Sequence, residues 1–307
     1  MINPDNTFIA LFSYNKEREL ETALNSIEKY MPDFTVHIYD DHSDNPQTLK
    51  VLKRYAGNET LRLAGNFAEE DSSLKSNEKC GNLHRNMQKA YHEAVQENAE
   101  YLFFLQDDIQ ILRPFSDAVR KEYTDIFERN DHVIEVDPRF VRKDCNARYS
   151  RELGGYVFAQ DDHRRGYADV GLFKINRLDK AGWVFLDGER PNKFQALEQG
   201  MIRVFPFTPL MMHVPFPSLY RKGKKLFKDN YFSGRGRFSY YDLIEKDRVI
   251  LDTRSPTDVP YPRKYLKVKG NGLLKYIYKI HIERMVYGGS TFFHGFVNYS
   301  LRKLQKK

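Results

Sequence analysis

Short apolar runs alternate with amphipathic stretches over the first 110 residues, and this alternation limits the possible folds more than any other feature. FIALF (8–12), TVHIY (35–39) and YLFFL (101–105) have the length and composition of strands buried on both faces of a sheet. The stretches 17–30 and 82–98 space their apolar residues at helical intervals. Alternating strands and helices predict βαβ units, right-handed crossovers and a parallel sheet.

Further elements are expected from shorter patterns. A helix is expected at 48–55 and a strand at 61–64. In the second half, the expected strands are 133–136, 155–158, 168–175, 202–205 and 210–214, and the expected helices are 193–199 and 273–286. The sequence therefore predicts an α/β fold in which a mostly parallel sheet is flanked by helices.

The composition suits one large domain, or one domain with an appendage. Of the 307 residues, 41% are hydrophobic and 30% are charged. There is no run of about 18 apolar residues, the length that a membrane-spanning helix needs. The N-terminal segment reads as a first strand rather than a secretory signal. Cys80 and Cys145 stand in no metal spacing, which argues against a disulfide framework or a cysteine zinc site and favours a reducing compartment.

The basic charge is concentrated at the C-terminal end. Residues 263–307 hold eleven Lys or Arg and one acid, Glu283, whereas residues 1–262 hold 38 basic and 41 acidic residues. Eight Tyr and Phe residues are interspersed among these cations. Such a segment suits an anionic membrane surface, where each cation contributes about 1 kcal/mol. The alternatives are packing on the main domain and an oligomer interface; nucleic-acid binding is not expected, because no recognition motif accompanies the charge.

Two acidic groups directly follow two of the expected strands. Gln106-Asp107-Asp108 comes after 101–105, and Asp40-Asp41-His42-Ser43-Asp44 comes after 35–39. In open parallel sheets, ligands bind beyond the carboxyl ends of the strands. We therefore expect the two acidic groups to lie at one edge of the sheet and to share one ligand.

Each acidic group has a chemical interpretation and a structural alternative. Mg²⁺ or Mn²⁺, held by carboxylates and substrate phosphates, would remove the cost of burying Asp107 and Asp108 unpaired. Their alternative role is to cap a helix or pair with an arginine. Asp41 suits the ring N–H of a uracil or the ribose hydroxyls, with a simple turn as the alternative. Tyr14, after the first strand, suits stacking on a base or ordinary packing.

The order of these motifs resembles that of family 2 glycosyltransferases of the GT-A fold. FIALFSYNKERELETALNSI followed by VHIYDDHSDNPQT resembles their first strand, Ser/Thr-Tyr-Asn turn, helix and second strand ending in Asp-Asp-x-Ser. GNLHRN (81–86) resembles their Gly-x-x-x-Arg-Asn helix start, and YLFFLQDDI (101–109) resembles their metal-binding strand end. The resemblance spans about residues 7–215 and implies a GT-A-like sheet and a nucleotide-sugar donor.

The resemblance also implies a role for each matching residue. Residues implied to contact the nucleotide sugar are Phe12, Tyr14, Asp40, Asp41, Arg85, Asn86 and Asp107. Within this set, Asp41 would contact the uracil. Asp108 would ligate the Mn²⁺ or Mg²⁺ ion, and His213 would approach the metal or the diphosphate. A core histidine is the alternative interpretation of His213, because Met and Val flank it.

Two departures from the family pattern affect the expected chemistry. Gln106 stands where the family usually has an acid, so metal binding would depend on Asp108. The acceptor-side Glu-Asp pair of the family is best matched by DGER (187–190). An inverting transfer needs a carboxylate base within hydrogen-bond reach of the acceptor hydroxyl. The candidates are Glu189 and then Asp187, with DD (161–162) in reserve and a solvated loop as the alternative for all of them.

The sequence as a whole predicts a metal-dependent glycosyltransferase that inverts by single displacement. The donor would be a nucleotide sugar, most simply a UDP-sugar, and the acceptor a glycan or a lipid-linked molecule. We expect a GT-A-like catalytic domain at 1–250, with its nucleotide-binding half at 1–110 and its acceptor half at 111–250. A basic, mainly helical extension is expected at 251–307.

The expected location is the cytoplasm, with the extension at the inner face of the cell membrane, and an oligomer is compatible with the sequence. One alternative function is a sugar-phosphate nucleotidyltransferase, which FSYN (12–15) disfavours because it is not a Gly-rich phosphate loop. The other is a non-catalytic nucleotide- or glycan-binding protein of the same descent, which Gln106 and Arg190 keep open.

Overall fold

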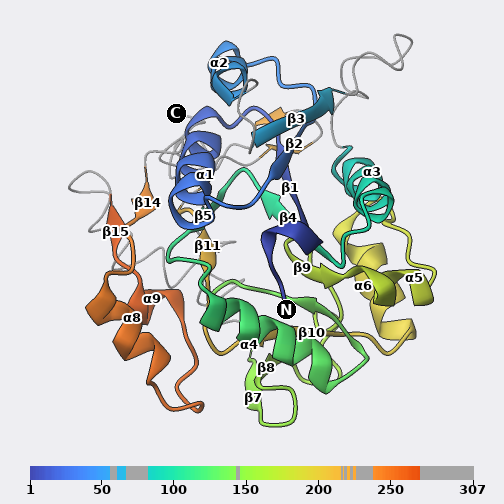
Figure 1. Ribbon diagram of the computed structural model, residues 1–307, viewed down its shortest axis with the longest axis vertical. Helices are drawn as coiled ribbons and strands as arrows, with labels where there is room; N and C mark the ends of the chain where they lie inside the picture. Colours follow the sequence, from blue (N-terminus) through green and yellow to red (C-terminus); the bar gives the residue numbers. More distant parts are fainter. Residues whose placement is uncertain are drawn as a thin grey trace, which may run out of the picture.

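A mixed β-sheet runs through the part of the chain that the computed structural model describes, with helices on both faces (Figure 1). The described residues are 1–55, 61–66, 82–142, 146–215, 217, 220–221, 224–225 and 238–269, with backbone alone at 61–66, 220–221 and 224–225. The strands are β1 (Thr7–Ser13), β2 (Val36–Asp40), β3 (Leu61–Asn66), β4 (Tyr101–Gln106), β5 (Ile109–Ile111), β6 (Val133–Val136), β7 (Arg148–Ser150), β8 (Gly155–Val157), β9 (Gly171–Lys174), β10 (Ile202–Pro206), β11 (Met211–His213), β12 (Tyr220–Arg221), β13 (Lys224–Lys225), β14 (Ser239–Tyr240) and β15 (Val268–Lys269). The helices are the 3₁₀ turn η1 (Pro4–Asn6), α1 (Glu17–Tyr30), α2 (Pro46–Tyr55), α3 (Leu83–Gln96), α4 (Asp117–Arg129), α5 (Ile175–Lys180), α6 (Glu189–Glu198), α8 (Glu245–Asp252) and α9 (Pro262–Tyr265).

The order of the nine-stranded sheet is β3-β2-β1-β4-β9-β6-β10-β8-β7. The first four strands are parallel, β9 is antiparallel to both of its neighbours, and β10 is parallel to β6. From β1 the chain builds outward through β2 to β3, and then returns to place β4 on the other side of β1. The strand order therefore reverses beside β1, the position at which α/β sheets bind ligands.

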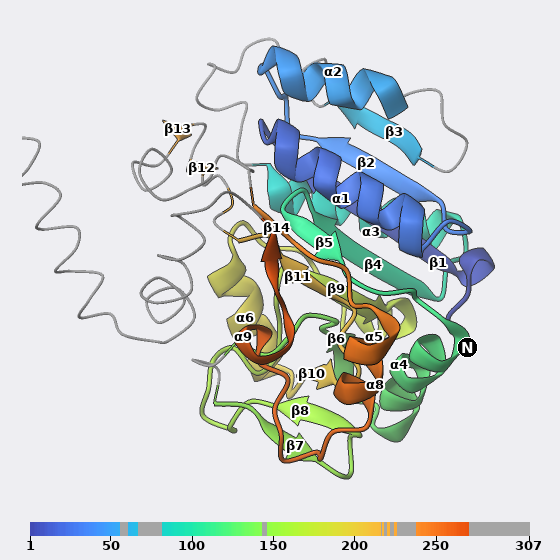
Figure 2. The same cartoon turned by 90° about the vertical axis from the view of Figure 1, so that its left-hand side faces the viewer.

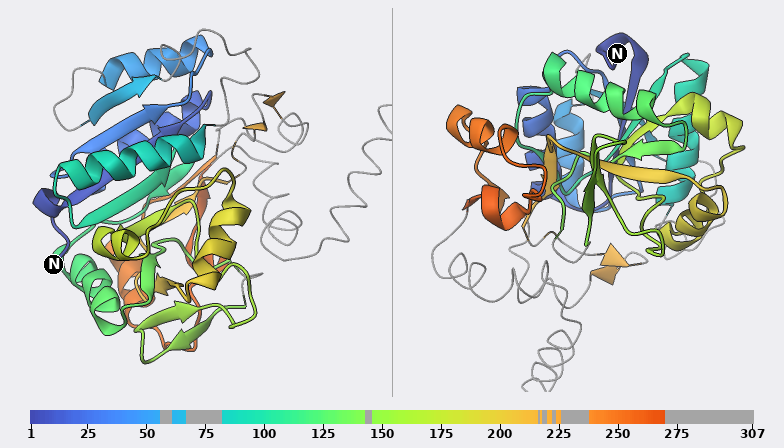
Figure 3. Two further views of the ribbon diagram at one scale, coloured as in Figure 1. Left: turned by 90° about the vertical axis from the view of Figure 1, so that its right-hand side faces the viewer. Right: turned by 90° about the horizontal axis from the view of Figure 1, so that it is seen from below.

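The side chains of β1 alternate between the two faces of the sheet, as strand geometry requires. Ile9 and Leu11 join the core beneath α1, α2 and α4, whereas Phe8, Ala10 and Phe12 join the core beneath α3, α5 and α6. Figures 1 and 3 show α1 and α3 on opposite sides of the sheet. Both faces of the central strands are thus covered, which explains their continuous apolar runs.

Helix α1 has the bounds predicted from its periodicity. Leu20, Leu24 and Ile27 lie on one face and are buried against the sheet. Glu17 and Glu19 occupy the first turn, where negative charge interacts favourably with the helix dipole. The backbone N–H of Met31 ends the helix by donating to the carbonyl of Ile27.

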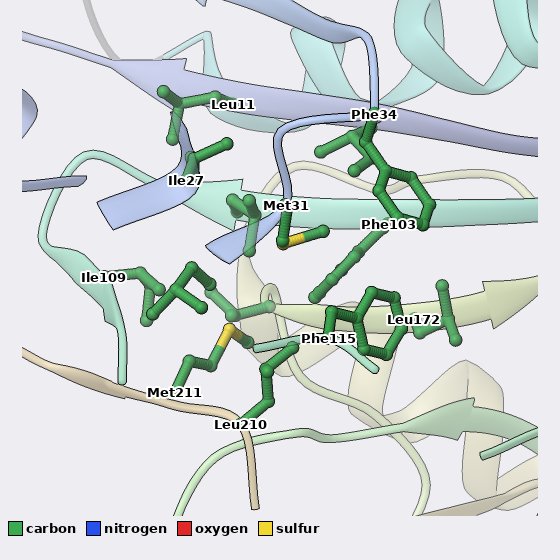
Figure 4. Close-up of a cluster of buried hydrophobic side chains, with 14 of the residues drawn as sticks. Leu11, Ile27, Met31, Phe34, Phe103, Ile109, Phe115, Leu172, Leu210 and Met211 are labelled. Atoms are coloured by element: carbon green, nitrogen blue, oxygen red, sulfur yellow. The ribbon is translucent and has the colours of Figure 1, made fainter. Parts of the chain in front are cut away.

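Phe103 lies at the centre of the core on the α1 face and has no exposed surface (Figure 4). We expect Phe103→Ala to lower the free energy of unfolding by about 3–5 kcal/mol, because the truncation leaves a cavity that the core does not fill. Phe194→Ala is the control, since the side chain of Phe194 on α6 is 43% exposed and its loss should change the stability little. Urea denaturation of both variants measures the difference, and equal stabilities would contradict the assigned core.

A further cluster joins residues 238–269 to the body of the fold. Leu251, Leu266 and Val268 pack with Leu112 and Met212, which lie beside β5 and on β11. Figure 2 shows β14 next to β11, which pairs with β5 outside the nine-stranded sheet. The predicted boundary at residue 250 falls within α8, and the division into domains stays a prediction. Residues 270–307 of the predicted extension, including the expected helix at 273–286, lie outside the described residues.

The predicted α/β class is confirmed, and the main differences lie after β4. The expected strand at 168–175 is shorter, because α5 begins at Ile175 directly after β9. Helix α4 and the short strand β5 were not among the predicted elements. Among the described residues, no helix is both long and apolar enough to cross a membrane.

Candidate active site

The two acidic groups flank the carboxyl end of β1. Strand β2 pairs with one side of β1, so that Ser13 stands opposite Asp40, and β4 pairs with the other side. Beyond these strands, the backbone N–H of Asp41 donates to the carbonyl of Ser13 at 2.8 Å. The backbone N–H of Asp107 donates to the carbonyl of Phe12 at 2.9 Å. Asp41 and Asp107 are therefore fixed on either side of one strand end, at the point where the strand order reverses.

Asp107 and Asp108 converge on one cation, the ammonium of Lys16. The Lys16 Nζ atom lies 2.9 Å from Asp107 Oδ1 and 3.1 Å from Asp108 Oδ2. The second oxygen of Asp107 accepts the backbone N–H of Tyr14 at 2.9 Å. Asp107 is 4% exposed and Asp108 is 6% exposed, so these contacts offset the cost of burying two adjacent carboxylates.

The two carboxyls share one ammonium, yet their pKa values are shifted in opposite directions. Burial raises the pKa of Asp107 above its usual value, and the attraction of Lys16 offsets this rise only in part. Burial also acts to raise the pKa of Asp108, but Lys16 and His213 outweigh it and hold the pKa below its usual value. Asp108 therefore stays ionised, as a ligand for a cation must.

His213 joins this group from β11, which pairs antiparallel with β5. Its Nδ1 atom lies 3.0 Å from Asp108 Oδ1, and its Nε2 atom lies 2.8 Å from Arg139 Nη1. Because a guanidinium only donates hydrogen bonds, Nε2 accepts, and the ring proton assigned to Nδ1 is donated to Asp108. Both ring nitrogens are thus engaged in this arrangement.

His213 also contacts a buried group of charged side chains. Asp137 has no exposed surface and accepts two hydrogen bonds from the Arg139 guanidinium, at 2.8 and 2.7 Å. Arg203 Nη1 lies 3.3 Å from the same carboxylate. A chain of hydrogen bonds therefore leads from Asp108 through His213 and Arg139 to Asp137, and fixes the orientation of the imidazole.

The second acidic group divides into a turn residue and a residue directed at α3. Asp40 accepts the backbone N–H and the hydroxyl of Ser43, at 2.8 and 2.6 Å, so its carboxylate stabilises the turn. Asp41 instead accepts the backbone and side-chain N–H groups of Asn82, both at 3.1 Å. Asp41 thereby holds the start of α3 beside the end of β1.

The predicted aromatic residues lie at different depths. Phe12 is buried, with its ring centroid 5.2 Å from that of Phe104 and 5.6 Å from that of Tyr39. It therefore lies in the core beneath the end of β1 rather than on an exposed surface. Tyr14 is half-buried in the turn that follows β1 and contacts Asp107 through its backbone.

The first turn of α3 carries the predicted Arg85 and Asn86. Arg85 is exposed, whereas Asn86 is 1% exposed. Within the described residues, neither side-chain polar atom of Asn86 has a hydrogen-bond partner. An unpaired buried amide is costly, so a partner supplied by a ligand would stabilise this side chain.

The candidate base Glu189 is the first residue of α6. Its side chain is 49% exposed; partial desolvation acts to raise its pKa, but an ion pair with Lys193 at 2.8 Å outweighs this effect and lowers the pKa, so the carboxylate is charged at neutral pH. Asp187 is exposed. In the reserve pair, Asp161 is exposed, and Asp162 is engaged by Arg164 at 2.7 Å.

His84 connects the Glu189 loop to the donor-side helix. Its Nδ1 atom accepts the backbone N–H of Gly188 at 3.2 Å, and its Nε2 atom lies 3.2 Å from Asp169 Oδ1. The loop that carries Asp187 and leads into α6 at Glu189 is thus bound to the first turn of α3, next to Arg85. This histidine therefore links the segment before α6 to the helix that carries Arg85 and Asn86.

Four residues of the site were not among the sequence predictions: Lys16, His84, Asp137 and Arg139. Lys16 had a usable signal, since it follows the strand that lies between two acidic strand ends. A cation at that position is expected to pair with one of them. No such signal marks Asp137 and Arg139, because their link to the site depends on the contact of Arg139 with His213 on β11.

Comparisons with known proteins give structural likeness alone. No protein-family model matches the sequence, and no curated protein matches it. Two crystal structures of TarS from S. aureus are similar at 14% identity, with TM-scores of 0.44 and 0.45. Each match covers 67% of this chain, and 59% and 36% of the respective TarS chains.

A third structure, the mannosyltransferase PcManGT from Pyrobaculum calidifontis in complex with GDP-Man and Mn²⁺, is similar at 15% identity with a TM-score of 0.42. The match covers 66% of this chain and 54% of that one. The chain thus spans between about a third and three fifths of the length of these proteins. Likeness at this level carries no inference about donor, acceptor or metal.

Proposed function

We propose that the chain transfers a glycosyl group from a nucleotide sugar, with a UDP-sugar as the donor. The observation that carries the proposal is the placement of Asp41 and the Asp107–Asp108 pair on either side of the end of β1. A nucleotide laid across this strand end would meet Asp41 at its base and the aspartate pair at its diphosphate. This is the binding position expected for an open α/β sheet.

The carboxylate of Asp41 suits the base, because it accepts hydrogen bonds and a uracil ring presents an N–H. Tyr14, half-buried in the turn between the two acidic groups, offers a ring on which the base can stack. Asn86 and the exposed Arg85, at the N-terminal end of α3, would donate to the diphosphate or the sugar.

The aspartate pair suits a hard divalent cation, Mn²⁺ or Mg²⁺. Two buried carboxylates already converge on one positive charge, the Lys16 ammonium, so their arrangement fits a bound cation. No group of three or more His, Cys, Asp or Glu side chains among the described residues forms a complete metal site. Phosphate oxygens and water would complete the coordination, as is usual for magnesium at phosphate sites. When bound, the cation would neutralise charge on the leaving diphosphate.

In the proposed reaction, the carboxylate of Glu189 takes the proton of the acceptor hydroxyl. The acceptor oxygen forms a bond to the anomeric carbon of the sugar as the bond from that carbon to the diphosphate oxygen breaks. The leaving nucleoside diphosphate keeps the bonding electron pair. Single displacement with Glu189 as the base inverts the anomeric centre. His84 acts by positioning, since it binds the Glu189 loop to α3.

The acceptor side of the proposal is broader. A glycan or a lipid-linked molecule is the acceptor class, and the basic segment 263–307 is proposed to bring the enzyme to an anionic membrane surface. Within that proposal, the enzyme works at the cytoplasmic face. An oligomer is compatible with this arrangement, and nucleic acid is not part of it.

The direct test is hydrolysis of a panel of nucleotide sugars, with and without Mn²⁺. We expect release of UDP from a UDP-sugar that depends on the cation. Absence of hydrolysis despite tight UDP binding would favour a non-catalytic binding protein. Synthesis of a nucleotide sugar from a nucleoside triphosphate and a sugar phosphate would instead favour a nucleotidyltransferase.

Asp41 offers a test of the nucleotide position. We expect Asp41→Ala to weaken UDP binding by about ten-fold or more, equivalent to about 1.4 kcal/mol, because a buried hydrogen bond to the base is lost. Binding of inorganic diphosphate, which has no base, should stay at the wild-type level. Titration calorimetry with both ligands measures this, and an equal loss for both would show that Asp41 acts by holding the start of α3 rather than through the base.

A further inference from the structure

Lys16 occupies the place in which the proposed function puts a divalent cation. It is the residue directly before α1, and its side chain is 14% exposed. Burial acts to lower the pKa of the ammonium, but Asp107 and Asp108 outweigh this effect and raise it. The lysine therefore stays charged, and the described chain already contains a cation between the two carboxylates.

All four oxygens of the aspartate pair have a protein partner. Asp107 Oδ2 accepts the backbone N–H of Tyr14, and Asp108 Oδ1 accepts the His213 ring N–H. The remaining oxygens, Asp107 Oδ1 and Asp108 Oδ2, both contact Lys16 Nζ. A cation held by both carboxylates would compete with Lys16 for these last two oxygens, because both already contact its Nζ atom.

We propose that the Lys16 ammonium and a divalent cation compete for these two oxygens, so that the cation binds well only together with a nucleotide diphosphate. The inference rests on the proposed function for the identity of the second ligand. A metal alone must displace a paired ammonium and leave it half-buried without a counter-ion, which is costly. A diphosphate supplies both the missing metal ligands and new acceptors for the three N–H groups of Lys16.

This exchange makes binding of the metal and of the nucleotide mutually dependent. If the diphosphate raises the affinity for the cation by some factor, the cation raises the affinity for the diphosphate by the same factor. Lys16 is then a positioning residue with two partners, the aspartate pair in the ligand-free chain and the diphosphate in the complex. In the absence of a donor, its ammonium disfavours the binding of other cations to the carboxylates.

The test is a titration of the ligand-free protein with Mn²⁺, in which electron paramagnetic resonance measures the unbound ion. We expect Lys16→Met to bind Mn²⁺ at least about ten-fold more tightly than the wild type does without nucleotide. The wild type should gain a similar factor when UDP is added, and Lys16→Met should gain less. Lys16→Arg keeps the charge and should stay close to the wild type.

Lys174→Met is the matched control. Lys174 is 15% exposed and pairs with Glu128 at 2.7 Å, so its loss removes one similarly buried ammonium. It stands opposite Tyr101, at the other end of β4 from Asp107. Mn²⁺ affinity should be unchanged in this variant, because the removed charge is remote from the aspartate pair.

Several outcomes would overturn the inference. One is equal Mn²⁺ affinity for Lys16→Met and the wild type without nucleotide; another is a wild type that binds Mn²⁺ equally well with and without UDP. If Lys16→Met unfolds, Mn²⁺ alone should restore its thermal transition, and failure to do so also counts against exchange. The comparison without nucleotide needs no UDP, so its result stands even if UDP fails to bind and the proposed function falls.

Discussion

Asp108→Asn is expected to lower cation-dependent release of UDP from the sugar donor by at least about 100-fold, or about 2.7 kcal/mol of transition-state stabilisation. The carboxylate is 6% exposed and held ionised by Lys16 and His213, so its charge acts in surroundings that screen it little. The amide keeps the shape of the side chain and removes the negative charge. The proposed cation would then lose the protein ligand on which it most depends.

Initial rates of UDP release with increasing Mn²⁺ measure this effect. Asp33→Asn serves as the control, since Asp33 is exposed in the segment before β2, at the end of that strand remote from the site. Full cation-dependent turnover by Asp108→Asn would exclude the assigned diphosphate position. A matching loss in the control would point instead to a general effect of charge.

The second large effect concerns stability. We expect Asp137→Ala to lower the free energy of unfolding by about 3–5 kcal/mol, because it leaves two guanidinium groups without their buried counter-ion. Asp137 has no exposed surface and is shared by Arg139 and Arg203. Arg139 would also lose its orientation toward His213, so the variant should disturb the position of the imidazole.

Chemical denaturation of Asp137→Ala beside Asp117→Ala measures the cost. Asp117 pairs with Arg120 on the surface of α4, and its side chain is 78% exposed. A surface pair of this kind contributes at most about 1 kcal/mol. Similar losses for the two variants would mean that the Asp137 group is open to solvent.

The first half of the fold could be predicted because its local and global signals agree. FIALF (8–12) is apolar without interruption, since both faces of β1 are covered by helices. The predicted helix 17–30 coincides with α1, because its buried positions recur at helical spacing and Pro32 follows. Because the local pattern and the overall fold agree in such segments, their structure can be predicted from sequence.

The second half was harder to predict because its elements are short and run into one another. Helix α5 starts at Ile175 without a break after β9, so the apolar run 168–175 resembles one long strand. Helix α4 is an exception, because it spans 13 residues and carries Val119, Tyr123 and Ile126 at helical spacing, so its pattern was detectable in the sequence.

Part of the site was also predictable, because it follows from the predicted sheet. Parallel strands place their carboxyl ends at one edge, so the positions of Asp41 and Asp107 follow from the sheet. Lys16, by contrast, reaches the aspartate pair because the turn after β1 folds back toward the end of β4, which sequence periodicity does not encode. The link from His84 to the Glu189 loop likewise depends on tertiary packing.

Strand β4 is hydrogen-bonded to β1 along one edge and to β9 along the other, and the aspartate pair follows its last residue. Opening the molecule between its two halves would break one of these ladders. Domain closure about a hinge is therefore a poor route for admitting a donor. Exchange of ligands should rely on the loops beyond the strand ends, while the carboxylates stay fixed as a rigid reference point.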